Sequence, residues 1–325
     1  MKLILFTVST FVASVSMVAA DVSLAGYGRF GLYYNEGSAE NNSRLDQRFR
    51  LDITGATETD TGIKLKGVIR FQTDDGSRGS SNVAQRSAAL FVVSSGNFQL
   101  NIGNASGLVD SDDVIDWYGY GVGVTKFAEQ STNFIIPITE FSVSNDEARI
   151  PPTVRATYRF EKFIFSATYT DDAVLAKNSS GDELGGTSES WEIGVGYKYD
   201  GLSFGGLHGA AETPSGKTNN YWAVTFNGTV GELGFSLLVA DSDMQDDTAY
   251  GASAKFHVNP VTELRIVYSD NGMDNYMQSG AKVKQGGLYA IGFRHGLGGG
   301  ITMAGGIGHS TLGNTVGDLG VIFNF

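Results

Sequence analysis

Apolar and polar residues alternate along most of this chain, and this two-residue period constrains the fold more than any other feature. In residues 44–54, Leu45, Phe49, Leu51 and Ile53 share one face, and mainly charged side chains occupy the positions between them. A period of two is that of a β-strand, whose successive side chains point to opposite faces. The pattern predicts sixteen strands, at residues 21–35, 44–54, 63–72, 86–94, 98–104, 153–160, 163–170, 191–199, 202–210, 221–228, 233–240, 250–258, 264–269, 288–295, 301–308 and 316–325.

The connections between these segments alternate as well, between short turns and long polar stretches. Links such as 59–61, 161–162 and 231–232 are interleaved with long ones such as 36–43, 74–85 and 270–282. This layout is typical of an outer-membrane barrel, whose long loops lie outside the cell. Because lipid offers no hydrogen bonds to the backbone, strands cross it only as a closed ring. We predict an all-β fold, a 16-stranded antiparallel transmembrane β-barrel. A soluble sandwich or propeller is the alternative, but it rarely needs so many polar-faced strands.

The amino-terminal residues form a segment of a different kind. Lys2 is followed by a mainly apolar, uncharged run that ends in small residues before Asp21. This pattern predicts a secretory signal peptide at residues 1–20 and a single barrel domain at residues 21–325. Removing Lys2 changes the formal net charge from −12 to −13. The acidic balance argues against nucleic acid as a partner, and the absence of cysteine excludes a disulfide scaffold.

The alternation stops over residues 105–152, which form the predicted outer-end connection between the fifth and sixth strands. A loop this long within a regular domain is either functional or disordered. Aromatic and branched residues such as Trp117, Tyr118 and Phe134 indicate that it packs against something. We therefore expect a long third loop folded into the lumen, where it forms a constriction. The predicted acidic side of this constriction consists of Asp110, Asp112, Asp113, Asp116 and Glu129, and the loop also carries Glu140, Asp146 and Glu147.

Arginine residues occupy the polar face of the first four predicted strands. A lipid-facing arginine near the bilayer midplane costs about 2–4 kcal/mol, so this face is expected to line the lumen. The predicted basic wall consists of Arg29, Arg44, Arg48, Arg50, Arg70 and Arg86. Opposed to the acidic loop, it forms a charged constriction that favours small polar solutes. The alternative is that the arginines pair with inward Asp46 and Asp52 and hold the wall together; both can be true.

Residues that would carry catalysis are scattered. The four histidines lie far apart without metal-ligand spacing, and no serine stands in a strand–elbow–helix context, so we predict no enzyme and no cofactor. Asp110, Asp112 and Asp113 together could bind calcium, but they match no EF-hand loop, and a solvated acidic loop is the better interpretation.

Four stretches of the chain resemble one known family. They are residues 22–29 (VSLAGYGR), residues 57–65, the acidic and aromatic start of the long loop, and residues 317–325 (GDLGVIFNF). Together they are similar to the trimeric general-diffusion porins of the alphaproteobacterial (Rhodobacter) type. The terminal strand, with Phe323 and Phe325 on one face, resembles the signal that the barrel-assembly machinery of Gram-negative bacteria recognises.

The resemblance implies a homotrimer in the lipid of the cell outer membrane, with one pore per subunit and no enzymatic activity. The expected function is a passive channel for small hydrophilic solutes and ions, with a constriction between the acidic loop and the arginine wall. The net charge predicts a mild cation preference. A substrate-selective channel, for example for sugars, is the alternative, although few aromatic residues besides Tyr27 and Tyr33 face inward. A barrel enzyme is a third alternative.

Overall fold

The computed structural model contains strands connected by turns and loops. It describes residues 21–38, 41–74, 84–144, 152–172, 176–177, 183–184, 188–212, 216–273, 275–278 and 281–325, so the predicted signal peptide at 1–20 lies outside the described residues. The strands are β1 (Asp21–Asn35), β2 (Ser43–Glu58), β3 (Lys64–Asp74), β4 (Gln85–Arg86), β5 (Leu90–Ser95), β6 (Phe98–Gly103), β7 (Thr153–Phe160), β8 (Phe163–Asp172), β9 (Ala176–Lys177), β10 (Glu183–Leu184), β11 (Ser188–Tyr199), β12 (Leu202–Glu212), β13 (Thr218–Val230), β14 (Leu233–Ser242), β15 (Ala249–Asn259), β16 (Thr262–Asp270), β17 (Asn275–Gln278), β18 (Ala281–Lys284), β19 (Leu288–Gly298), β20 (Ile301–His309) and β21 (Thr315–Asn324).

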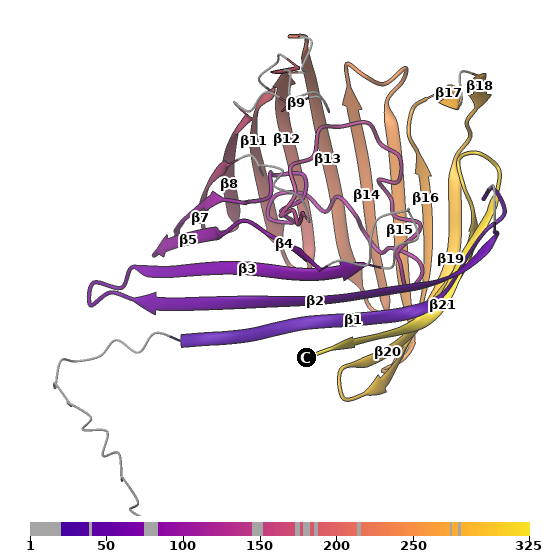
Figure 1. The fold of residues 1–325 in the computed structure, drawn as a ribbon, viewed down its shortest axis with the longest axis horizontal. Helices are drawn as coiled ribbons and strands as arrows, with labels where there is room; N and C mark the ends of the chain where they lie inside the picture. The colour runs from indigo at the N-terminus through magenta and orange to yellow at the C-terminus, as the bar shows by residue number, and fades with distance from the viewer. Residues whose placement is uncertain are drawn as a thin grey trace, which may run out of the picture.

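The strands close into one antiparallel ring (Figure 1). Sequential neighbours pair with each other, and β1 pairs with both β2 and β21, which joins the two ends of the sheet. Both β4 and β5 pair with β3, so they form one interrupted strand, and the barrel has the predicted sixteen. The short hairpins β9–β10 and β17–β18 lie outside this ring. Among the described residues, no helix is long and apolar enough to cross a membrane.

The two faces of the ring differ in polarity as the alternation predicts. Large apolar side chains such as Leu24, Phe30, Phe165 and Ile193 are exposed on the outer face. Exposure of so large an apolar surface to water is unfavourable. Contact with the hydrocarbon chains of lipids removes this cost, as in outer-membrane barrels. The inner face carries the arginines of β1–β3 and the threonines and serines of β7 and β8.

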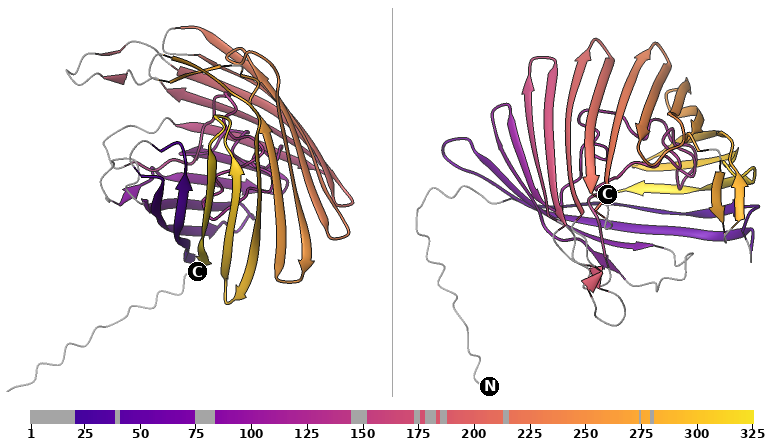
Figure 2. Two further views of the ribbon diagram at one scale, coloured as in Figure 1. Left: turned by 90° about the vertical axis from the view of Figure 1, so that its right-hand side faces the viewer. Right: turned by 90° about the horizontal axis from the view of Figure 1, so that it is seen from above.

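Residues 104–144, which follow β6, lie inside the ring, as Figure 2 shows. Their apolar members Leu108, Ile115 and Trp117 are fully buried and pack against inward residues of β12–β14 such as Leu207 and Leu238. The hydrophobic core of this barrel therefore lies between the loop and one wall. The expectation of an inward third loop is confirmed.

The wall that receives the loop is built from small residues. A Cβ atom at Gly205 would overlap the carbonyl oxygen of Val114, and one at Gly251 would overlap that of Gln130. A side chain at either position would push the loop backbone into the lumen. These inward glycines of β12 and β15 explain why the loop leaves the facing wall, β1–β3, open.

The last strand closes the barrel with aromatic side chains. Phe325 exchanges two backbone hydrogen bonds with Gly26 of β1, at 2.9 and 3.1 Å. The Phe325 ring stacks on Phe49 of β2 with 5.3 Å between centroids, and the Phe323 ring covers Gly28. Both predicted assembly-signal residues therefore pack over the seam where the first and last strands meet.

Candidate functional site

Two buried carboxylates of the barrel wall hold the loop in place. Glu192 of β11 accepts hydrogen bonds from the Leu108 N–H at 2.5 Å, the Thr168 hydroxyl at 2.8 Å and the Tyr221 hydroxyl at 3.2 Å. Asp318 of β21 accepts from the backbone N–H groups of Val124 at 2.9 Å and Thr125 at 2.7 Å. The loop is thus attached on two sides of the barrel, which fixes its course across the lumen.

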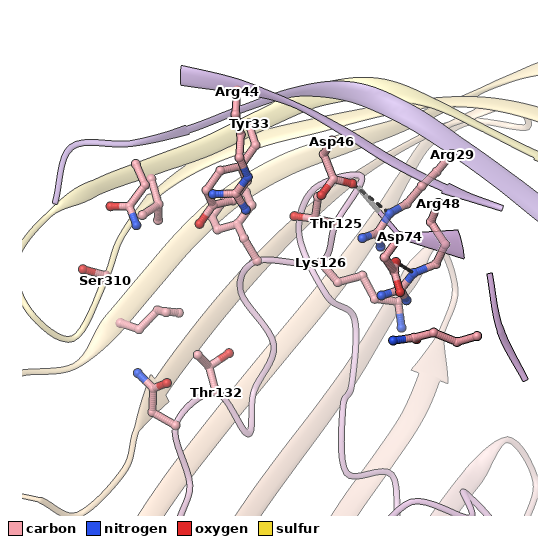
Figure 3. A pocket seen from close by; sticks show the side chains of 16 residues that line it. Arg29, Tyr33, Arg44, Asp46, Arg48, Asp74, Thr125, Lys126, Thr132 and Ser310 are labelled. Atoms are coloured by element: carbon pink, nitrogen blue, oxygen red, sulfur yellow. Dashed lines mark hydrogen bonds and ion pairs between the residues drawn. The ribbon is translucent and has the colours of Figure 1, made fainter. Parts of the chain in front are cut away.

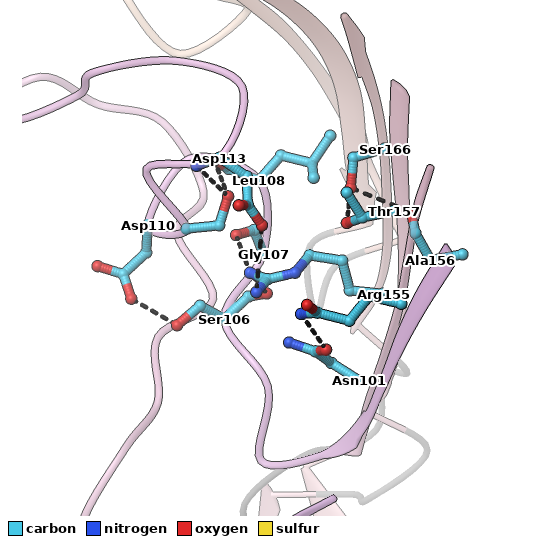
Figure 4. Close-up of polar contacts among 12 residues, drawn as sticks. Asn101, Ser106, Gly107, Leu108, Asp110, Asp113, Arg155, Ala156, Thr157 and Ser166 are labelled. Atoms are coloured by element: carbon cyan, nitrogen blue, oxygen red, sulfur yellow. Dashed lines mark hydrogen bonds and ion pairs between the residues drawn. The ribbon is translucent and has the colours of Figure 1, made fainter. Parts of the chain in front are cut away.

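Part of the predicted acidic patch also serves to attach the loop. Asp113 lies 2.8 Å from Arg159 and 3.6 Å from Arg155, both on β7. Arg155 also donates to the carbonyl oxygens of Ser106 and Gly107, and Figure 4 shows its side chain reaching from the wall to the loop. Asp116 accepts from the Gly119 N–H at 2.9 Å. Neither Asp113 nor Asp116 lines the charged cavities described next.

A cavity of about 500 Å³ separates the loop from the wall of β1–β3. The loop contributes acidic residues on one side and the wall contributes basic residues on the other. Of the predicted residues, Asp110, Glu129, Arg29, Arg48, Arg50 and Arg70 line it, and Glu140, Lys126 and Arg294 join them. The structure therefore brings the loop acids and the wall arginines to opposite sides of one space.

A second cavity of about 650 Å³ continues from the first and is drawn in Figure 3. The two share Arg29, Arg48, Thr125 and Lys126 among their lining residues, so they form one path. The predicted Arg44 lines this second cavity, and its guanidinium carbon lies 4.0 Å from the centroid of the Tyr33 ring.

Most wall arginines are paired within the wall. Arg29 lies 3.0 Å from Asp46, Arg70 lies 2.7 Å from Asp52, and Arg48 pairs with Asp74. Arg50 differs, because its Nε donates to the Gln72 amide oxygen at 2.7 Å rather than to a carboxylate. The arginines thus hold the wall together and line the cavity at once, as the two alternatives allowed.

Arg86 does not belong to this wall, and its assignment was wrong. It pairs with Phe71, which faces outward, and its own side chain is exposed. The register between β3 and β4 differs by one residue from that between β3 and β5, because residues 87–89 interrupt the strand. A one-residue shift moves a side chain to the opposite face of a sheet.

The structure also does not support calcium at Asp110, Asp112 and Asp113. Asp110 accepts from the hydroxyls of Ser106 at 2.7 Å and Tyr118 at 2.6 Å, whereas Asp113 binds the arginines of β7. Within the described part of the chain, no three acidic, histidine or cysteine side chains converge as a metal site would require.

Burial raises the pKa of three loop carboxyls, Asp112, Glu129 and Glu140. Desolvation, with repulsion from Asp116 and Asp110, raises the pKa of Asp112 to about 6, although part of its side chain is exposed and it lines neither cavity. Desolvation also raises the pKa of Glu129, and the nearby positive charge of Lys126 partly offsets this rise. Desolvation, and then the hydrogen bond to Asp110, raises the pKa of the Tyr118 hydroxyl, so this group stays protonated as a donor.

Sequence reasoning left five residues of this region out of the predicted site: Lys126, Glu140, Glu192, Arg294 and Asp318. Arg294, Glu192 and Asp318 all fall on the inward positions of their predicted strands, so the alternation would have placed them in the lumen. Their partners could not be found in this way, because each lies far from them in sequence. Glu140 was recognised as an acidic residue of the loop, but nothing in the sequence indicated that it lines the cavity opposite the arginines.

Comparisons with known proteins agree with this geometry. The sequence profile described as Gram-negative porin matches residues 6–315. The chain belongs to the Gram-negative porin family. The porin of Fuscovulum blasticum is 26% identical over 266 residues, covering 73% of this chain and 90% of that protein. Two engineered variants of Rhodopseudomonas blastica porin share the fold with TM-scores of 0.75 and 0.76. They are 23% and 22% identical, and each match covers 94% of this chain and all of the variant.

Membership in this family decides the class of the protein. It is a porin, a non-enzymatic channel of the outer membrane of a Gram-negative bacterium. The predicted family, fold class and location are confirmed.

Proposed function

We propose that this porin is a passive channel for small hydrophilic solutes and ions, and that its selectivity is set where the loop faces the arginine wall. The observation that carries this proposal is the cavity lined by Asp110, Glu129 and Glu140 on one side and by wall arginines on the other. Charged groups on two sides of a narrow path create a transverse field, which favours solutes that can align with it and disfavours apolar ones.

The channel acts as a homotrimer embedded in outer-membrane lipid, an arrangement typical of the family. The barrel-assembly machinery inserts it, with Phe323 and Phe325 as its recognition residues. The exposed apolar face of the strands supports contact with lipid, and the packing of both rings over the closing seam is compatible with their role in assembly.

Reconstitution into a planar lipid bilayer tests this function. Purified protein is expected to produce stepwise conductance increases in groups of three, one for each pore of a trimer. Protein that inserts but conducts no ions would contradict the proposal. The same recordings in a salt gradient measure ion selectivity through the reversal potential, where the net charge predicts a mild cation preference. Saturable block of the current by a sugar would instead favour the substrate-selective alternative.

The position of the constriction has a separate test. Replacing Asp110 with asparagine removes one charge from the cavity and keeps an acceptor oxygen for Ser106 or Tyr118. We expect the reversal potential to shift toward anions. The matched control is Asp60→Asn in the exposed turn between β2 and β3. Equal reversal potentials for the native protein and Asp110→Asn would place the selectivity elsewhere in the pore.

A further inference from the structure

A third cavity, of about 690 Å³, lies on the inner face of β2–β6, toward the turn that joins β2 to β3. It shares no lining residue with the two cavities beside the loop. Short turns of this kind mark the periplasmic end of an outer-membrane barrel. Lys66 of this cavity and Arg70 of the constriction are four residues apart on β3, or about 13 Å along the strand. The cavity is therefore a separate site on the periplasmic side of the constriction.

Side chains of three neighbouring strands form the floor of this cavity. Lys66 of β3 pairs with Val92 of β5, and Val92 pairs with Asn101 of β6. Directly opposite residues have Cβ atoms about 4.5–5.5 Å apart, and diagonal ones such as Lys66 and Leu90 about 7–8 Å. Leu90 itself pairs with Gly103, which has no side chain to cover it. One cation and two apolar side chains thus lie next to each other on the lumen wall.

Leu90 and Val92 present apolar surface to the lumen. Both are half-buried and line the cavity, whereas inward apolar residues of β12–β14 such as Leu207 and Leu238 are buried beneath the loop. Apolar surface that faces water is favourably covered when another apolar group binds to it. The two residues therefore offer a contact for the hydrocarbon part of a solute.

Lys66 keeps an available positive charge beside this apolar surface. Its side chain is exposed, and it forms no ion pair with any residue that the structure describes. The neighbouring Lys64 lies 3.9 Å from Glu58, which opposes its charge. Asp21 and Lys66 pair with Ala56 from opposite sides, so their backbones are about 10 Å apart. A carboxylate can approach Lys66 without displacing a partner within the protein.

We propose that this cavity binds small amphiphilic monocarboxylates, with the carboxylate on Lys66 and the hydrocarbon chain on Val92 and Leu90. This binding site goes beyond the proposed channel function, because none of its residues belongs to the constriction. It gives the periplasmic mouth of the pore an affinity for a class of solute that the charged constriction does not distinguish by its apolar part.

Other classes of solute make only part of these contacts. A neutral amphiphile gains the apolar contact alone, and a short carboxylate such as acetate gains the ion pair alone. An amphiphilic ammonium ion is repelled by Lys66, and Glu58, one of the two acids of the cavity, is already opposed by Lys64. The amphiphilic carboxylate is attracted at both ends.

Saturation-transfer difference NMR on the full porin in lipid nanodiscs tests this site, with empty nanodiscs as the background. Hexanoate, hexanamide and hexylammonium are nearly equal in size and differ in charge, and butyrate and acetate shorten the chain. We expect hexanoate to bind most tightly of the five. Lys66→Gln should weaken hexanoate binding by about two- to fivefold, the effect of one exposed ion pair. Val92→Thr should weaken it by up to about fourfold, the effect of losing contact with one methyl group.

Lys198→Gln is the matched control. It removes an exposed lysine from the inner face of β11 at the same end of the barrel, and Lys198 does not line this cavity. Its hexanoate affinity should equal that of the native protein, and Lys66→Arg, which keeps the charge, should retain most of the binding.

Equal hexanoate affinities for the native protein and Lys66→Gln would overturn the proposal. Hexanamide or hexylammonium binding as tightly as hexanoate would overturn it too, and so would acetate doing so. Because binding is measured without ion flow, it is independent of the bilayer recordings. A protein that binds hexanoate but conducts no ions would refute the proposed function and uphold this site.

Discussion

Replacing Glu192 with leucine is expected to release the first half of the long loop from the barrel wall. The carboxylate is buried and accepts three hydrogen bonds, one of them from the loop backbone at Leu108. Leucine has a similar size but no acceptor. Thr168 and Tyr221 then lose a partner inside the wall, and the loop loses the bond that ties it to β11.

The size of the effect follows from the bond to the loop. A hydrogen bond to a charged group contributes about 1.5–3 kcal/mol to stability. Once the loop detaches, the Leu108 N–H forms a hydrogen bond with water instead. The free energy of loop opening should fall by this amount, which corresponds to an increase of about 10- to 150-fold in the open population. Glu192→Gln keeps one acceptor oxygen and should have a smaller effect.

Hydrogen exchange of the purified trimer, followed by mass spectrometry, measures this opening locally. Exchange should accelerate in peptides covering residues 105–117 and stay unchanged in strands β1–β3, which do not contact Glu192. Glu232→Leu, in the exposed turn before β14, is the matched control. If the loop amides of Glu192→Leu exchange at the native rate, the carboxylate does not hold the loop, and the reasoning is wrong.

Three further predictions follow from the same contacts. Gly205→Val should displace the loop backbone at Val114 and change single-channel conductance, whereas Gly55→Val, at a position with free space, should leave it unchanged. Because the pKa of Asp112 is raised to about 6, acidification through this pH should protonate it, and reversal potentials should shift toward anions; Asp112→Asn should remove this step. Phe325→Ala loses a stacked aromatic pair at the closing seam worth about 0.5–1.5 kcal/mol, and the barrel should unfold at a lower temperature in gel-mobility assays.

The sequence by itself determined the barrel. Alternation is a property of neighbouring residues, so it identified the strands and the inward positions of Arg29, Arg48 and Arg70 without knowledge of their partners. The long break in the alternation marked the loop. Its apolar residues predicted that it packs rather than projects into water, and the clusters around Trp117 confirm this packing.

The tertiary structure alone decided which charges are neutralised. Arg70 finds Asp52 and Arg48 finds Asp74 only through the register of β2 and β3, and Arg86 leaves the lumen because three residues interrupt its strand. Some acids of the loop attach it to the barrel, and others line the cavity. The difference depends on strands distant in sequence, such as β7, whose Arg159 pairs with Asp113. Local alternation assigns each side chain to a face, but its partners depend on register, ring closure and the path of the loop across the lumen.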